Sequence, residues 1–94
     1  KISFLMELNR WQNFAKNQQF LTIAAEFTRA KNWQYKDQEK FLLALERALE
    51  LIDLTLADLK WRNNSYILLR LREEVAKFYT SQRTDDISVL SRAL

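Results

Sequence analysis

The fold is decided by residues 41–59, FLLALERALELIDLTLADL, the most regular stretch of the chain. Leucine or isoleucine recurs there with alternating spacings of three and four, at positions 42, 45, 49, 52, 56 and 59. This spacing is the heptad seam of a packed helix. Asp37 lies just ahead of the stretch and is a suitable N-cap. We therefore expect one long helix from residue 37 to residue 61.

Helical periodicity also precedes this stretch. An apolar stripe runs through residues 1–16, and a second stripe through residues 20–30 has a different phase. Four polar residues at 16–19 lie between the two stripes. This pattern favours two helices joined by a turn at 16–19, although one long helix that changes partners along its length would also satisfy it.

Two further helices are expected after the central one. Residues 63–65, Asn-Asn-Ser, predict a break, because Asn tolerates left-handed backbone and Ser caps helices. A helix is expected over 66–81, and a last one begins near 84–86 and carries Ile87, Leu90 and Leu94 on one stripe. Alternation of period two is nowhere sustained. The chain is therefore expected to form one all-α domain over residues 1–94, a small antiparallel up-and-down bundle of three to five helices.

Four residue types are missing from the 94 residues: Gly, Pro, Cys and His. Without Gly there is no phosphate-binding Gly loop, and without Cys there is no thiolate nucleophile, disulfide or Cys-based zinc site. Without His the commonest general base and the Ser-His-Asp arrangement are lost. We therefore expect no enzymatic activity, no catalytic residues, no bound metal and no cofactor.

The central helix is apolar on more than one side. Opposite the heptad seam, a narrow polar strip is formed by Glu39, Glu46, Glu50, Asp53 and Lys60. Four further apolar residues lie beside or near this strip: Leu43, Leu51, Leu54 and Trp61. A helix that is apolar on two sides is buried on two sides. We expect these four residues to lie in or near the interface of a homo-oligomer. In the alternative, a neighbouring helix of the same chain covers them.

Charge is segregated along the chain, whose net charge is +3. Residues 1–36 carry six basic and two acidic residues, residues 37–59 carry two basic and six acidic, and residues 60–94 carry seven basic and four acidic. An acidic central helix between basic segments can pair its charges within the fold. This distribution weakens the nucleic-acid reading that a basic protein otherwise suggests.

Two clusters nevertheless combine cations with aromatic rings, the mixture that single-stranded nucleic acids bind. Possible contacts are Arg29, Lys31, Trp33, Lys36, Lys60 and Arg62. Both clusters fall near predicted helix ends, where cations also complement the helix dipole. A basic accessory protein for RNA or single-stranded DNA is therefore the second interpretation of the sequence.

Three carboxylates, Glu46, Glu50 and Asp53, share one face of the central helix. Oxygen ligands of this kind suit Mg²⁺. No matching acidic strip precedes them, so we interpret them as a solvated face, and a metal-dependent hydrolase is the third reading.

The first interpretation is a non-enzymatic protein–protein interaction or oligomerisation module. Its expected partners are a second copy of the chain or another protein, and nucleic acid ranks behind them. The longest apolar run, residues 41–45, is too short to cross a bilayer, so no membrane contact is expected. The missing cysteines fit a cytoplasmic protein.

Overall fold

The computed structural model describes residues 2–93, and the side chains of residues 6–92. This part of the chain forms helices joined by turns and contains no strand, which confirms the predicted all-α fold class. The helices are α1 Ile2–Trp11, α2 Lys16–Trp33, α3 Gln38–Leu56, the short 3₁₀ helix η1 Leu59–Asn64, α4 Ser65–Tyr79 and α5 Ser88–Ala93. None of the helices described is long and apolar enough to cross a bilayer.

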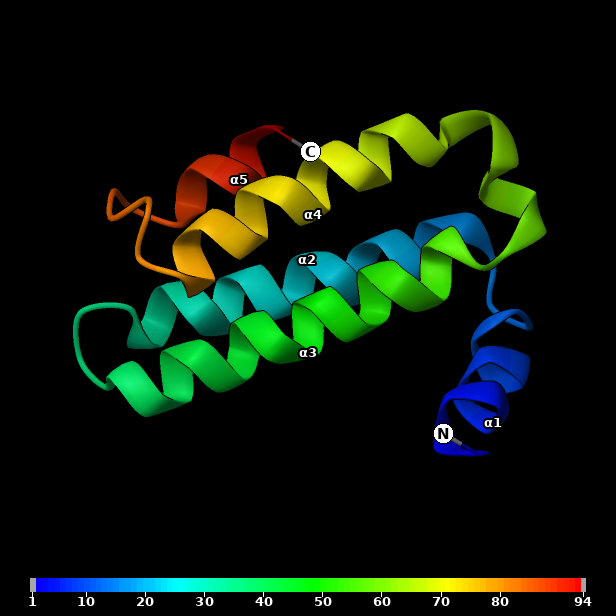
Figure 1. Ribbon diagram of the computed structural model, residues 1–94, viewed down its shortest axis with the longest axis horizontal. Helices are drawn as coiled ribbons and strands as arrows, with labels where there is room; N and C mark the ends of the chain where they lie inside the picture. The colour runs from blue at the N-terminus through cyan, green and yellow to red at the C-terminus, as the bar shows by residue number, and fades with distance from the viewer. Residues whose placement is uncertain (1, 94) are drawn as a thin grey trace.

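Four of the helices form an up-and-down bundle (Figure 1). Helices α2 and α3 make a long antiparallel hairpin, α4 packs on α3, and the short α5 packs on α2. Helix α1 lies apart from α4 and α5 and packs against α3 near the open end of the hairpin, where α2 begins and α3 ends. Because α3 contacts α1, α2, α4 and η1, it is the central helix, as its apolar sequence requires.

Helix α3 begins where the sequence predicts and ends earlier. The Asp37 side chain accepts a hydrogen bond from the Lys40 backbone N–H at 3.2 Å, which confirms the predicted N-cap. The helix ends at Leu56, not at residue 61, because Asp58 caps η1 by accepting a bond from the backbone N–H of Lys60. Leu59 consequently leaves the heptad seam and is 79% exposed.

Helices α1 and α2 are separate, as the sequence favoured, but the turn lies at residues 12–15 and not at 16–19. The polar residues at 16–19 belong to the first turn of α2. Gln18 stabilises that turn, because its side-chain oxygen accepts a hydrogen bond from the Ala15 backbone N–H at 3.0 Å. Gln19 is fully buried, because its amide is hydrogen-bonded inside the fold.

The link to α5 is also built without glycine. Ser81 adopts a left-handed conformation with φ of 65° after the end of α4, a position that glycine usually fills. Gln34, the C-cap residue of α2, then holds the start of α5: its side chain donates to the Asp85 carbonyl and accepts from the Ile87 backbone N–H, both at 2.7 Å. Helix α5 begins at residue 88, and Ile87 and Leu90 are buried as predicted, whereas Leu94 lies outside the described residues.

A candidate binding groove between α2 and α3

The α2–α3 hairpin has one covered face and one partly open face. Helices α4 and α5 lie over the first, and α1 covers only one end of the second (Figure 1). Beyond α1, the open face contains a shallow groove between the two long helices. Its lining residues are Arg29 and Trp33 of α2 and Lys40, Leu43 and Ala44 of α3. We refer to these five residues as the α2–α3 groove.

The centre of the groove is apolar. Leu43 is 56% exposed, Ala44 is buried in the groove floor, and Trp33 is partly buried against the core. Trp33 falls in the last turn of α2, and Leu43 lies in the second turn of α3. The antiparallel hairpin therefore brings two apolar side chains, ten residues apart in sequence, to the same open surface.

The edges of the groove are cationic. The Lys40 Nζ lies 4.2 Å from the centroid of the Trp33 ring, a cation–π contact. Arg29 pairs with Glu26, which is buried, through an Nη1–Oε1 distance of 3.2 Å. Within residues 6–92, no carboxylate lies at ion-pairing distance from Lys40. Glu39 and Glu46 are exposed on α3 about one turn to either side of Leu43, so the charge beside the groove is mixed.

The structure places the four predicted interface residues differently from one another. Leu51, Leu54 and Trp61 are buried within the chain itself, at 1%, 2% and 9% exposure. Other parts of the same chain cover these three side chains in the structure, and Trp61 itself lies in η1 and not on α3. Of the four residues, Leu43 alone is exposed.

Trp61 belongs to a buried polar network at the opposite end of the hairpin. Its Nε1 donates to the Gln19 side-chain oxygen at 2.6 Å, and the Gln19 nitrogen donates to Asp58 and to the Trp11 carbonyl, each at 2.9 Å. Burial acts to raise the pKa of Asp58, but hydrogen bonds from Lys60 and Gln19 outweigh it and lower that pKa. The network is fully paired and joins α1, α2 and η1, so its role is structural.

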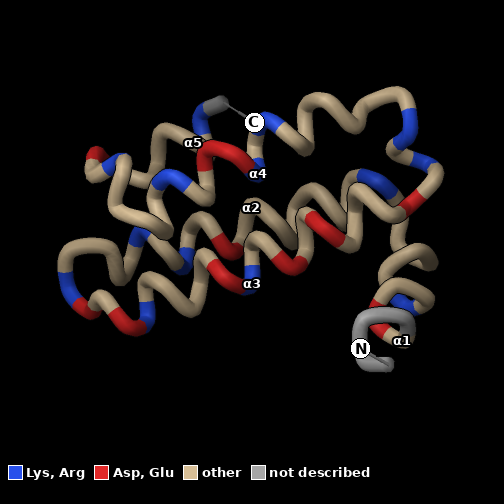
Figure 2. Tube along the Cα trace, viewed as in Figure 1, with Lys and Arg blue, Asp and Glu red and all other residues tan. Residues whose placement is uncertain are grey.

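The six residues predicted to contact nucleic acid are not brought together. Arg29 and Trp33 lie in the groove, and Lys36 lies in the nearby α2–α3 turn. Lys60 and Arg62 lie in η1 at the far end of the hairpin, where Lys60 pairs with Asp58. Lys31 is close enough to Asp86 to lower the pKa of that carboxyl, after the larger contribution of the hydrogen bonds with Ser88. Figure 2 shows Lys and Arg positions interspersed with Asp and Glu positions along the trace.

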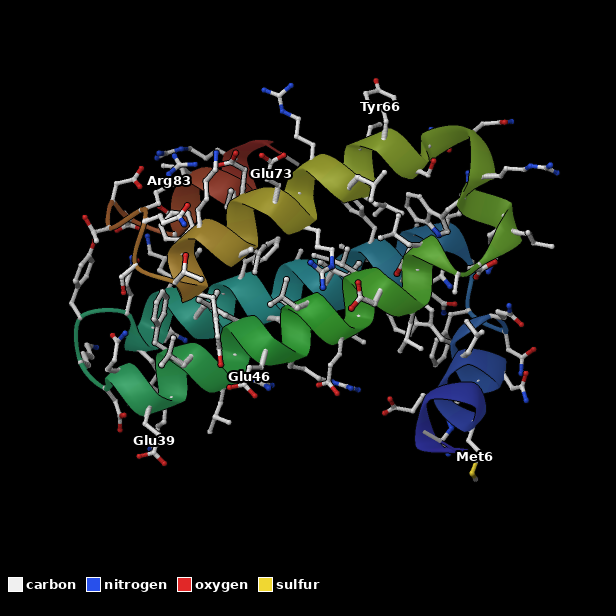
Figure 3. The ribbon with its side chains drawn as sticks, in the orientation of Figure 1. Met6, Glu39, Glu46, Tyr66, Glu73 and Arg83 are labelled. Carbon is white, nitrogen blue, oxygen red and sulfur yellow. The ribbon has the colours of Figure 1, made fainter. Side chains whose placement is uncertain are left out.

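The three carboxylates of α3 have separate partners, and Figure 3 labels one of the three, Glu46. Asp53 accepts from Arg72 of α4 at 2.7 Å, Glu50 lies 3.8 Å from Arg47, and Glu46 accepts from the Tyr79 hydroxyl at 3.0 Å. That last bond raises the pKa of Tyr79. Within the described part of the chain, no acidic cluster could hold a metal ion.

Two of the groove residues, Lys40 and Ala44, were not singled out in the sequence. The sequence does place Lys40 on one face of α3 with Arg47, because the two residues are seven apart. The packing of Trp33 against Lys40 could not be read from the sequence, since it depends on the register between α2 and α3.

Comparison of the chain with protein-family models, with curated proteins and with solved structures found no match.

Proposed function

We propose that this chain is a small helical module that binds another protein through the α2–α3 groove and has no catalytic chemistry of its own. The observation that carries the proposal is the pairing of Trp33 and Leu43 on an uncovered stretch of two long, well-packed helices. A groove between two helices with an apolar floor is a common docking surface for a third, amphipathic helix.

The residue types in the groove support this proposal. Trp and Arg are over-represented among the residues that contribute most to protein interfaces, and a rim of polar residues around an apolar centre is typical of such sites. Trp33 and Arg29 lie on the α2 side of the groove, and Leu43 faces them from α3. Lys40 supplies the polar rim while its ammonium stays in contact with the Trp33 ring.

The distribution of cations favours a protein partner over a nucleic acid. Binding to a phosphate backbone needs several cations along one track. Here Arg29, Lys36 and Lys40 lie at or near the groove, but Arg29 is paired with Glu26. Arg47, further along α3, is paired with Glu7 and Glu50, and Lys60 and Arg62 lie in η1, beyond the other end of α3.

A peptide-display selection tests the proposal. A library of helical peptides is selected for binding to the wild-type chain, and the enriched peptides are measured against two variants, Leu43→Glu and Leu69→Glu. The two leucines are matched, because they are 56% and 55% exposed, and Leu69 lies outside the groove on α4. We expect Leu43→Glu to weaken binding about tenfold or more and Leu69→Glu to leave it unchanged. Equal effects of the two substitutions would refute the proposal.

Self-association is measured in the same set of proteins. Light scattering across a wide concentration range gives the mass of the wild-type chain and of Leu43→Glu. A dimer that Leu43→Glu dissociates identifies a second copy as the occupant of the groove. A wild-type chain that stays monomeric assigns the groove to a different protein.

A further inference from the structure

The open end of the hairpin, where α2 begins and α3 ends, is a tip built from two connections. The turn between α1 and α2 lies beside η1 at the right of Figure 1. The Lys60 Nζ joins the two by donating to the Gln12 carbonyl at 3.0 Å, and the Lys16 Nζ joins them again by donating to the Asn64 side-chain oxygen at 2.9 Å. We refer to residues 10–16 and 57–66 as the tip.

The tip presents large apolar side chains to solvent. Leu59 is 79% exposed, although the residues on both sides of it are anchored: Asp58 and Trp61 are buried, and each is hydrogen-bonded to the Gln19 side chain of α2. These two anchors keep Leu59 between them on the surface. Phe14, from the other connection, is 40% exposed. Each half of the tip therefore contributes an apolar side chain that is open to solvent.

The tip also carries the net charge of the chain. It has four basic residues, Arg10, Lys16, Lys60 and Arg62, and one carboxylate, Asp58. Because the whole chain has 15 basic and 12 acidic residues, the rest of it is balanced at eleven of each. Asp58 is buried and paired with Lys60, whereas Arg10, Lys16 and Arg62 are exposed and have no carboxylate at ion-pairing distance within residues 6–92.

The carboxylates that adjoin the tip in sequence do not cancel this charge. Glu7 of α1 pairs with Arg47, and Asp53 of α3 pairs with a cation of α4. Further along α2, Glu26 is buried, and on α4 the first carboxylate, Glu73, lies two helical turns beyond the tip. An anionic surface that approaches the tip therefore meets uncompensated positive charge.

We propose that the tip binds the surface of a bilayer that contains anionic phospholipids. Leu59 and Phe14 would enter the interfacial region, and Arg10, Lys16 and Arg62 would lie among the headgroup phosphates. Apolar area inserted at the interface and cations near anionic headgroups are the two contributions that hold peripheral proteins on such membranes. The contact stays at the surface and needs no spanning helix, so it replaces the expectation of no membrane contact. It is also separate from the α2–α3 groove.

The apolar side chains of the tip favour a bilayer over a nucleic acid. Leu59 is the most exposed of the large apolar residues described. Single-stranded nucleic acids bind where bases stack on aromatic rings, and an aliphatic side chain has no such ring. Tyr66, which is 69% exposed, suits either surface, because tyrosine is also enriched at membrane–water interfaces.

Co-sedimentation of the full chain with vesicles tests the proposal. The probes are vesicles of phosphatidylcholine alone and vesicles of phosphatidylcholine mixed with phosphatidylserine, at physiological ionic strength. Each uncompensated cation near an anionic surface strengthens binding about fivefold, so three should make the chain prefer the anionic vesicles by about a factor of 100. This preference should fall as the salt concentration rises.

Matched substitutions separate the two contributions. Arg62→Gln should weaken binding to the anionic vesicles about fivefold, whereas Lys36→Gln, at an exposed cation in the α2–α3 turn at the opposite end, should not weaken it. Leu59→Ser should weaken binding about tenfold, whereas Leu43→Ser, at a leucine that is 56% exposed in the groove, should leave it unchanged. All four side chains are exposed, so the variants are expected to keep the fold.

NMR with spin-labelled lipid identifies the surface that meets the vesicle. A nitroxide on the lipid headgroup should attenuate the backbone amide signals of residues 12–16 and 59–66 and spare those of residues 34–38 at the opposite end. Attenuation confined to other residues would place the membrane contact elsewhere and overturn the proposal.

The remaining outcomes also overturn it. Equal binding to both kinds of vesicle removes the role of the cations, and absence of binding to either removes the membrane contact. A single-stranded oligonucleotide that binds more tightly than the anionic vesicles, and that Arg62→Gln releases, assigns the tip to nucleic acid. Self-association that Leu59→Ser abolishes assigns the tip to a second copy. None of these results decides the proposed function, which the display selection with Leu43→Glu tests separately.

Discussion

Leu43 and Leu54 lie on the same edge of α3, but Leu43 lies where this edge is open and Leu54 lies where it is covered. They are eleven residues apart, three helical turns, so their side chains leave the helix in nearly the same direction. Leu54 is 2% exposed at the end of α3 where α1 packs, whereas Leu43 is 56% exposed in the groove. Truncating each to alanine therefore compares the two environments directly.

The two substitutions should lower the free energy of unfolding by clearly different amounts. Leu54→Ala removes a fully buried side chain and leaves a cavity, so we expect it to lower the free energy of unfolding by about 3 kcal/mol, within a usual range of roughly 2–5 kcal/mol. Leu43→Ala removes a side chain that is less than half buried and leaves no cavity, so its cost should stay below about 1 kcal/mol. A domain of this size has a total stability of roughly 5–14 kcal/mol. Leu54→Ala therefore removes a large share of it.

Urea unfolding followed by tryptophan fluorescence measures both costs, at two protein concentrations. The cost of Leu54→Ala should not depend on concentration, because the side chain is buried within one chain. Its melting temperature should fall by roughly 12–24 °C. Equal costs for the two variants would refute the reasoning. A Leu54→Ala cost that grew with protein concentration would return Leu54 to a subunit interface.

Three further predictions concern the polar contacts. Gln19→Ala should cost about 3 kcal/mol or more in urea unfolding, because it leaves the buried Trp61 N–H without a partner and removes one of the hydrogen bonds to the Asp58 carboxylate; a cost below about 1 kcal/mol would contradict this. The pKa of Asp58 is lowered from its ordinary value of 3.8, so its carboxylate stabilises the fold above that pH, and this contribution is lost as the pH falls through the lowered pKa. Asp58→Asn should therefore lose less stability than the wild type between about pH 5 and pH 2, and parallel pH profiles would contradict that expectation. Asp53→Asn breaks a pair with Arg72 in which both side chains are about two-fifths exposed, so it should cost at most about 1 kcal/mol and less in high salt.

Most of the secondary structure could be predicted because apolar spacing reports helices directly. The heptad stretch locates α3, and Asp37 marks its beginning. The turn between α1 and α2 was misplaced because Gln19 reads as a polar surface residue. It is buried because its amide finds partners in Asp58, Trp61 and the Trp11 carbonyl, all distant from it in sequence. Hydrogen-bond partners of this kind are set by tertiary contacts and leave no local pattern.

The candidate site was predictable only in part. The sequence pointed to Leu43 as one of four residues with excess apolar surface, and to Arg29 and Trp33 as members of a different cluster. Their meeting in one groove follows from the register of the α2–α3 hairpin. That register depends on side-chain packing across the two helices, which periodicity within either helix does not define.

By itself, the sequence determined that the chain is a helical bundle around a central leucine-rich helix, because a 3.6-residue apolar period without Gly or Pro supports little else. It also determined that α3 has more apolar surface than one neighbour can bury. Only the tertiary structure decided which neighbours bury it. Helices α1, α2 and α4 and the 3₁₀ helix η1 pack on α3 and leave the stretch around Leu43 uncovered, because α1 ends at Trp11 and covers only one end of the open face.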